Sequence, residues 1–126
     1  MVYQYIITKD LNISLLSNKN MKEDSIFLDY VGDTPRMRIL QHFIEGRDFD
    51  YTLTDLLNAG VSWGTLNSLV PKLLELGIII KMRKIGRATL YKINSENVMM
   101  KQLIFLYDKL ITEKLNLLEH ENVISV

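Results

Sequence analysis

The sequence predicts a mainly α (α+β) domain in which three short helices precede a β-hairpin and a long final helix. Two observations lead to this prediction. A capped amphipathic pattern at 62–76 stops at Gly77, and glycine commonly ends helices. Alternating apolar and basic residues then flank a glycine-containing turn at 84–87, which is typical of a hairpin. The helix and hairpin at 61–94 are therefore the segment around which the rest of the chain is interpreted.

The composition is that of an ordinary globular protein. The chain has 126 residues, of which 48% are hydrophobic and 24% charged, so we expect one domain with an added arm or helix. It has no cysteine, which excludes disulfides and a thiol nucleophile. His42 and His120 lie far apart without ligand-like spacing, so no metal or other cofactor is predicted. No apolar run reaches the roughly 20 residues of a membrane span, and the start, MVYQYIITKD, lacks a signal-peptide pattern. A cytoplasmic protein is expected.

The first helices are marked by their capping residues. The apolar run at 25–31 is too short to decide between strand and helix. Thr34 is then a typical N-cap with Pro35 at the first helical position, and Gly46 ends the predicted helix. The expected buried stripe of this helix consists of Ile39, Leu40, Phe43 and Ile44.

A second helix is predicted from Thr52, because Asp55 follows in the capping-box position. The connection before it, at 47–51, contains Phe49 and Tyr51, which favour a brief strand. The helix ends at Gly60. Two short helices, a glycine-containing turn and a third helix form a tri-helical pattern.

The third helix, capped by Ser62, combines a buried face with a weakly charged outer side. The expected buried residues are Leu66, Leu69, Val70, Leu73 and Leu76. Trp63, Gly64, Asn67, Ser68 and Lys72 take the other side. Small polar side chains let a helix approach base edges, and Asn pairs with adenine, although the same residues also suit plain solvent. Pro71 is expected to kink this helix.

The hairpin is strongly basic. Ile78, Ile80 and Met82 alternate with Ile79, Lys81 and Arg83; Lys84 to Arg87 forms the turn; and 88–93 returns with Tyr91 and Ile93 facing inward. Between 81 and 92 there are five basic residues and no acidic one, a charge of +5, so the rest of this neutral chain carries −5. Charge alone is also a way to protect a sheet edge. Five cations exceed what edge protection needs, which favours contact with phosphates.

A long final helix is predicted after Asn94-Ser95, reaching about Glu119 and followed by a tail from Asn122. It carries two neighbouring apolar stripes. One contains Met99, Leu103, Leu106, Leu110 and Leu117, and the other contains Met100, Ile104, Tyr107, Ile111, Leu115 and Leu118. One stripe can lie on the chain's own core and the other on the same helix of a second subunit. The alternative is a helix buried entirely against its own domain.

These segments resemble a family of archaeal winged helix-turn-helix transcriptional regulators, related to the MarR-, ArsR- and PadR-like groups. The match runs from about Val31 to Leu103 and includes GDTPRMRIL at 32–40, FDYTLTDLL at 49–57, VSWGTLNSLVPKLLELGII at 61–79 and RKIGRATLYKIN at 83–94. The resemblance implies a winged-helix fold, binding to specific sequences of duplex DNA, and homodimers joined by terminal helices; it implies no effector. The chain then divides into an N-terminal arm at 1–25, a winged-helix DNA-binding domain at 26–94, and a C-terminal dimerisation helix and tail at 95–126.

The leading hypothesis is a homodimeric transcriptional regulator that binds double-stranded DNA. The expected DNA-binding residues are Ser62, Trp63, Gly64, Thr65, Asn67, Ser68 and Lys72 of the third helix, and Arg83, Lys84 and Arg87 of the hairpin. Arg87 is also placed to reach the minor groove, Lys72 and Arg47 are lower-ranked phosphate contacts, and Trp63 has the equal alternative of packing on the second helix. The expected dimer interface consists of Met99, Leu103, Leu106, Tyr107, Leu110, Ile111 and Leu117.

The alternative from another class is a winged-helix protein-interaction module without specific DNA binding, because fold does not fix function. Salt-sensitive retention on mixed duplex DNA separates the two. An enzyme is not predicted, since no phosphate-cradling loop or nucleophile–base pair is present. An effector pocket between the long helix and the core, lined by Met99, Phe105 or Tyr107, is a weaker hypothesis.

Overall fold

The computed structural model describes residues 25–125, with side chains described as far as Glu119. The elements are α2 (Ile26–Val31), α3 (Pro35–Glu45), α4 (Leu53–Leu56), the 3-10 helix η1 (Leu57–Ala59), α5 (Trp63–Glu75), β1 (Ile79–Ile85), β2 (Ala88–Ile93) and α6 (Val98–Ser125). The predicted arm lies outside the described residues except for Ser25, whose hydroxyl caps α2 by accepting the Leu28 N–H at 3.1 Å. The apolar run at 25–31 is therefore helical.

The three central helices begin at their predicted caps. These are Thr34 for α3, Thr52 for α4 and Ser62 for α5, which accept the N–H groups of Met37, Asp55 and Thr65 at 3.2, 3.1 and 3.1 Å. The capping box at Thr52 is complete, because the Asp55 carboxylate accepts the Thr52 N–H at 2.9 Å in return. Such caps satisfy backbone donors that a helix start leaves unpaired.

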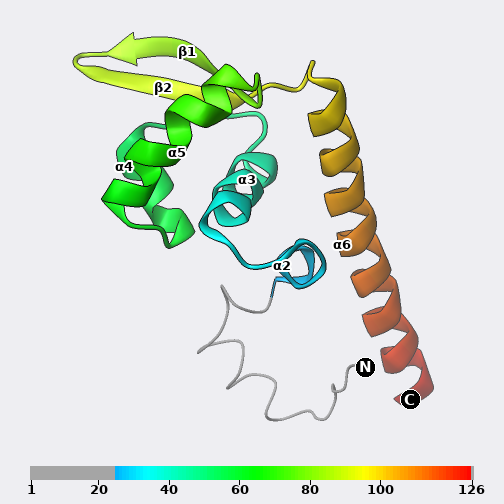
Figure 1. Cartoon of the computed structure of the whole chain (residues 1–126). Coiled ribbons are helices and arrows are strands. Elements are labelled where there is room, and N and C mark those ends of the chain that lie inside the picture. The colour runs from blue at the N-terminus through cyan, green and yellow to red at the C-terminus, as the bar shows by residue number, and fades with distance from the viewer. Residues whose placement is uncertain (1–24, 126) are drawn as a thin grey trace.

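The helix α3 lies in the middle of the molecule, against α2, η1 and β2 (Figure 1). Its four predicted core residues are all buried. They form one cluster with Phe27 and Leu28 of α2, Leu56 of α4, Leu66, Val70 and Leu73 of α5, Ile79 of β1, and Tyr91 and Ile93 of β2. This cluster fixes the orientation of α5 and the hairpin relative to the rest of the fold.

The helix α5 runs without interruption through Pro71, which lies on its exposed side. Leu66, Val70 and Leu73 are buried as predicted, and Leu69 is partly buried. The prediction for Leu76 was wrong, since its side chain is 54% exposed. The reason is that α5 ends at Glu75, so Leu76 no longer follows the spacing of the buried face.

The hairpin is a two-stranded antiparallel sheet, and we call residues 79–93 the wing. Ile85 pairs with Ala88, which leaves Gly86 and Arg87 as a two-residue turn. Gly86 has φ of +63°, a conformation that favours glycine and suits tight hairpins. On the other side of β2, Tyr51 exchanges two backbone hydrogen bonds of 2.7 Å with Tyr91, so the predicted brief strand before α4 is a single bridge.

The inward face of β1 differs from the prediction. Ile78 and Ile79 are buried, whereas Ile80 and Met82 are 39% and 47% exposed. Ile79 lies opposite the buried Ile93, and an irregularity between Lys81 and Arg83 then shifts the register. The offset already exists before this irregularity, because β1 begins at Ile79, whose side chain is buried, and Ile80 therefore faces outward. A shift of one residue moves every side chain of a strand to the other face. Tyr91 and Ile93 face inward, as predicted.

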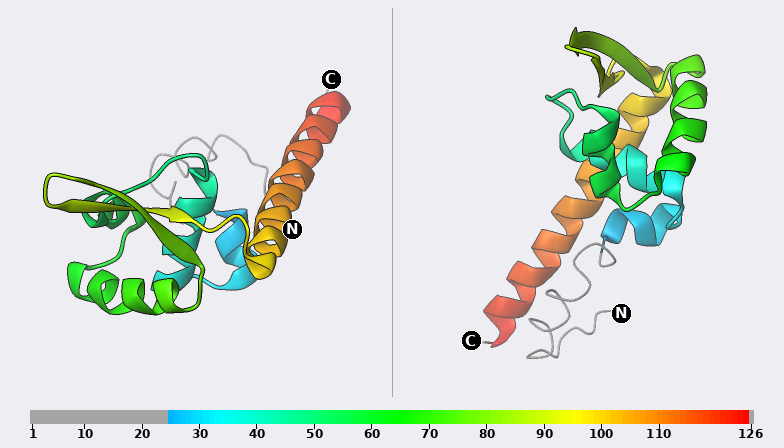
Figure 2. Two further views of the ribbon diagram at one scale, coloured as in Figure 1. Left: turned by 90° about the horizontal axis from the view of Figure 1, so that it is seen from above. Right: turned by 90° about the vertical axis from the view of Figure 1, so that its left-hand side faces the viewer.

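The helix α6 begins later and ends later than predicted. Its cap is Asn97 and not the Asn94-Ser95 pair, because the Asn97 side-chain oxygen accepts the N–H groups of Met99 and Met100 at 2.8 and 3.1 Å. It continues to Ser125, since no glycine or proline follows Glu119. Its first half packs on α2, and its far end projects beyond the other elements (Figure 2). No helix within residues 25–125 is long and apolar enough to cross a membrane.

Candidate nucleic-acid interface

The outer face of α5 is exposed and almost uncharged. Gly64, Ser68 and Lys72 follow one another at four-residue spacing, so they share a face, and all three are exposed. Trp63 and Asn67 lie at the edge of this face and are exposed too. The Trp63 side chain is 49% exposed, which leaves about half of the indole accessible to a ligand. The only acidic residue of the helix is Glu75, in its last turn.

Two predicted residues at the start of α5 already use their side chains within the protein. The Ser62 hydroxyl accepts the Thr65 N–H at 3.1 Å and donates to Thr65 Oγ1 at 2.9 Å. Thr65 is partly buried. These two hydroxyls stabilise the first turn of α5. Their hydrogen-bonding groups are therefore used inside the protein, and they contribute less to the outer face than the free side chains do.

At the tip of the wing, two cations have no partner among residues 25–125. Lys84 and Arg87 are both exposed, and neither forms a hydrogen bond or ion pair with the part of the chain that the structure describes. Lys81 is exposed on the same strand. Cations held at a hairpin tip, away from acids, are available to phosphate groups.

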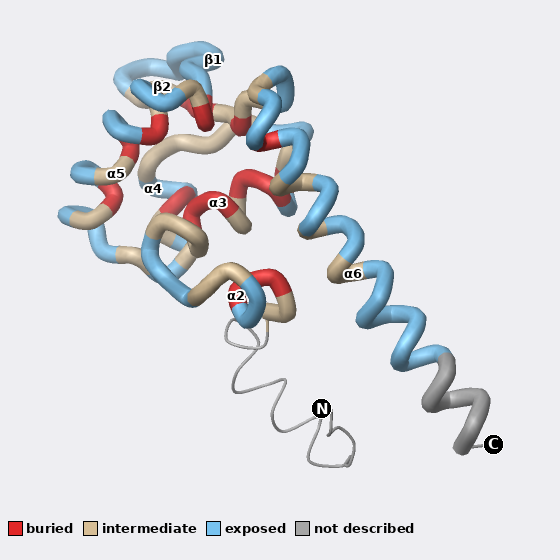
Figure 3. The backbone as a smooth tube through the Cα atoms, turned by 45° about the vertical axis from the view of Figure 1, so that its right-hand side comes forward, coloured by how far each residue is buried: buried red, intermediate tan, exposed pale blue. Residues whose placement is uncertain are grey.

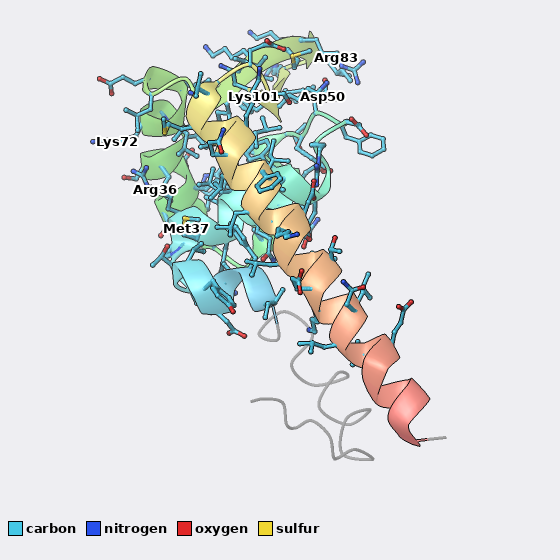
Figure 4. The ribbon with its side chains drawn as sticks, turned by 90° about the vertical axis from the view of Figure 1, so that its right-hand side faces the viewer. Arg36, Met37, Asp50, Lys72, Arg83 and Lys101 are labelled. Atoms are coloured by element: carbon cyan, nitrogen blue, oxygen red, sulfur yellow. The ribbon has the colours of Figure 1, made fainter. Side chains whose placement is uncertain are left out.

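Arg83, unlike Lys84 and Arg87, forms an ion pair within the protein. Its guanidinium donates to Asp50 through two nitrogens, at 2.8 and 3.2 Å, and Figure 4 shows the two residues together at the wing. Asp50 immediately precedes Tyr51, which pairs with β2, while Arg83 belongs to β1 on the other side of β2. The ion pair therefore crosses β2 and ties the wing to the α3–α4 connection. Its hydrogen bond lowers the pKa of Asp50 and raises that of Arg83.

Arg47, a lower-ranked phosphate candidate, lies against α6. It donates to both oxygens of Asp108 at 2.7 and 2.9 Å and to the Ile44 carbonyl at 2.9 Å. These bonds raise the pKa of Arg47 and lower that of Asp108. Arg47 thus connects α6 to the end of α3, and its contact with phosphate stays a prediction.

The residues predicted for the dimer interface fall into two groups. Leu103, Tyr107 and Leu110 are partly buried against the chain's own core, and Ile111 is also partly buried. Met99, Leu106 and Leu117 are exposed, together with Phe105, Leu115 and Leu118 of the same helix. Figure 3 shows that the described far half of α6 is almost entirely exposed. An apolar surface of this extent remains uncovered in the single chain.

A small cavity of about 310 Å³ lies between α2, α3, η1 and α6. His42 and Glu45 line it, as does Tyr107, one of the three residues suggested for an effector pocket; Met99 and Phe105 do not. The buried His42 Nε2 has no hydrogen-bond partner among the described residues, and burial lowers the pKa of His42. That a small molecule binds here stays a prediction. Within the described residues, no cluster of His, Cys, Asp and Glu is arranged to hold a metal.

Three packed helices followed by an antiparallel wing define the winged helix-turn-helix fold, as predicted. No protein-family model matches the sequence, and no curated protein does either. Among solved structures, NadR in complex with 4-hydroxyphenylacetate is similar over 95% of this chain and 85% of its own, with a TM-score of 0.58 and 17% identity. A point mutant of MepR from S. aureus is similar over 96% and 85%, with a TM-score of 0.54 and 13% identity.

Wild-type apo MarR from E. coli is similar over 90% of this chain and 84% of its own, with a TM-score of 0.52 and 15% identity. At such low identities the likeness shows a shared winged-helix fold. MepR and MarR come from bacteria, so the archaeal origin implied by the sequence resemblance gains no support from them and stays a prediction.

Proposed function

We propose that this chain is a transcriptional regulator that binds specific sequences of double-stranded DNA as a homodimer. In this proposal α5 enters the major groove and the wing lies on the DNA backbone. The observation that carries it is the placement of unpaired cations, Lys84 and Arg87, at the tip of a hairpin that follows directly after an exposed, polar helix face. The winged-helix fold is compatible with this use, and cytoplasmic DNA is the expected target.

The two parts of the interface have different tasks. The outer face of α5 carries one cation, Lys72, so it contributes little electrostatic attraction. Asn67 has an amide that can bond both the N6 and N7 edges of adenine. The wing supplies charge, which contributes affinity to every sequence alike. We therefore assign selectivity to α5 and most of the affinity to the wing, with Arg83 mainly holding the wing in position through Asp50.

The homodimer is supported by the exposed apolar surface of α6. Its far half projects beyond the domain and carries Leu115, Leu117 and Leu118 in contact with solvent. Large apolar side chains that gather in the exposed part of a soluble protein commonly mark an interaction surface. In a homodimer, the exposed far halves of α6 from two copies would pack together, as self-complementary surfaces do around a two-fold axis.

Binding is tested with two variants and a control on a duplex selected from a random library. Arg87→Ala should weaken binding to all duplexes and reduce the slope of log K against log salt by about one, because one phosphate contact is lost. Asn67→Ala should leave that slope unchanged and reduce discrimination against the mismatched base by about 1–3 kcal/mol. Lys109→Ala, on the exposed side of α6, should change neither.

The measurements are fluorescence anisotropy titrations at several salt concentrations. If both variants bind the selected duplex as wild type does, this docking arrangement is wrong. If the wild-type chain shows no salt-sensitive retention on duplex DNA at all, the protein-interaction alternative replaces the proposal.

A further inference from the structure

A groove lies between the start of α3 and the first half of α5. It has a volume of about 610 Å³ and is lined by Thr34, Pro35 and Arg36 on one side and by Gly64, Thr65, Ser68 and Leu69 on the other. The α5 side of the groove includes Gly64 and Ser68, which belong to the outer face described above. The groove is thus continuous with the surface proposed to meet DNA, and it contains no acidic residue.

Arg36 differs from most arginines of this chain. Arg38, Arg47 and Arg83 each bind both oxygens of an aspartate: Asp33, Asp108 and Asp50, respectively. Arg36 and Arg87 have no hydrogen bond or ion pair with the described residues. Arg87 is at the wing tip, where a phosphate contact is already proposed. Arg36 is partly buried in the wall of the groove, so its side chain is held there while no residue of 25–125 pairs with its charge.

A second polar group in the groove also lacks a partner. The Ser68 hydroxyl forms no hydrogen bond within the described residues, whereas the Thr34 and Thr65 hydroxyls are used in the caps of α3 and α5. Lys72 is one turn beyond Ser68 on the same face, and Figure 4 shows Arg36 and Lys72 on the same side of the molecule. A guanidinium, a hydroxyl and an ammonium group therefore gather along one flank of α5.

We propose that this groove seats a phosphodiester of the DNA backbone, with Arg36 as its main ligand and Ser68 as a second donor. The inference rests on the proposed function and adds to it a contact on α3, outside both α5 and the wing. Arginine suits this role because its planar fork of N–H donors matches two phosphate oxygens. Such a contact fixes the register of a protein on the duplex and reads no bases. The Arg36 contact would hold the DNA backbone beside the first half of α5. The wing would contact the backbone beyond the last turn of α5.

The test compares Arg36→Ala, Arg36→Lys and Lys109→Ala in the full chain, by anisotropy titration with the selected duplex and a scrambled one. Arg36→Ala should lower affinity for both duplexes by the same factor, about five- to tenfold at 0.1 M salt, and reduce the salt slope by about one. Arg36→Lys should restore the slope and part of the affinity. Thermal unfolding of Arg36→Ala should match wild type, because the side chain has no partner to lose. Lys109→Ala should bind as wild type.

Three results would overturn the inference. In the first, Arg36→Ala keeps wild-type affinity and slope while Arg87→Ala does not, which leaves the proposed function standing. In the second, Arg36→Lys loses the salt slope as completely as Arg36→Ala, although its charge is retained. In the third, Arg36→Ala affects only the selected duplex, which would make Arg36 a base contact. Absence of salt-sensitive binding by the wild-type chain would instead refute the proposed function itself.

Discussion

The Tyr107 side chain links α6 to the rest of the domain through two contacts. Its hydroxyl donates to Glu45 Oε2 at 3.0 Å, and its ring meets that of Phe27 edge to face, with centroids 5.4 Å apart. Burial and the neighbouring Glu45 carboxylate disfavour the phenolate and raise the pKa of Tyr107 to about 12. The contact therefore requires the phenol to keep its proton.

Tyr107 should make stability fall at alkaline pH. In the unfolded chain a tyrosine releases its proton near pH 10, whereas the folded chain holds it until about pH 12. Between these values the folded state binds more protons, so the free energy of unfolding decreases as pH rises. Below pH 10 this contribution is complete.

The measurement is urea unfolding of wild type and Tyr107→Phe between pH 8 and pH 11.5. The difference in stability between the two should be constant up to about pH 10 and change above it in favour of the variant. A difference that does not vary with pH would show that the phenol titrates normally in the folded protein.

Among elements, α5, β1 and α6 meet at one backbone carbonyl. The Gly77 oxygen accepts hydrogen bonds from the side-chain amides of Asn94 at 2.9 Å and Asn97 at 3.0 Å. Gly77 has φ of +72°, a left-handed conformation that favours glycine. Asn97 also caps α6 through its side-chain oxygen. One asparagine thus caps the start of α6 and binds it to the residue that follows α5.

Replacing Asn97 should cost more than replacing an asparagine elsewhere on α6. Asn97→Ala removes a helix cap and a hydrogen bond to Gly77, and we expect a loss of about 1–2 kcal/mol in the free energy of unfolding. Asn116→Ala, on the exposed far half of the same helix, should change it by less than about 0.5 kcal/mol. Urea denaturation measures both. Equal effects would mean that the cap contributes little.

The elements that the sequence predicted well depend on contacts between near neighbours. The caps at Thr34, Thr52 and Ser62 involve residues three positions apart, and the buried stripe of α3 follows from helical spacing alone. The start of α6 was misplaced because Asn94, Ser95 and Asn97 are all residue types that cap helices, and the local sequence does not decide between them. The face of β1 was predicted wrongly because the first of three consecutive isoleucines to enter the strand, Ile79, is set by its pairing with Ile93 on β2.

The candidate site was predictable only in part, for the same physical reason. The outer face of α5 and the basic turn follow from chain order and periodicity. The Arg83–Asp50 pair joins residues 33 positions apart, and no local pattern indicates it; an acid between the two aromatic residues of the predicted brief strand was the only signal. Arg36 was not predicted to belong to the site at all. Its position beside Gly64 and Ser68 depends on how α3 and α5 pack, which no local pattern indicates.

At the scale of the whole molecule, neutral charge hides an uneven distribution. Three arginines form ion pairs with aspartates, while Arg36, Arg87 and the wing lysines form none within the described part of the chain. The exposed far half of α6, which carries Leu115, Leu117 and Leu118, extends away from the wing (Figure 3). A charged surface and an apolar surface at separate places suit a protein that binds DNA with one and a second copy of itself with the other.

The proposed homodimer is tested by placing a charged residue on the exposed far half of α6. Leu117 is 57% exposed, so Leu117→Glu should leave the fold of a single chain intact and convert the dimer to a monomer, because a buried carboxylate without a partner is costly. Asn116→Glu, one residue away, should stay dimeric. Light scattering at micromolar concentration measures both. A monomeric wild-type chain would refute the homodimer.

The two attachments of α6 to the rest of the domain affect how the helix can move. The helix is about 42 Å long at 1.5 Å per residue, and it is held at its start by the Gly77 carbonyl and near its middle by the Arg47–Asp108 pair. A helix attached at two points cannot pivot around a single hinge. A displacement of its far leucines is therefore transmitted to Gly77 and to the end of α5. In the proposed homodimer, substitutions that alter the crossing angle of the two α6 helices would change the preferred separation of DNA half-sites, although they lie far from any base.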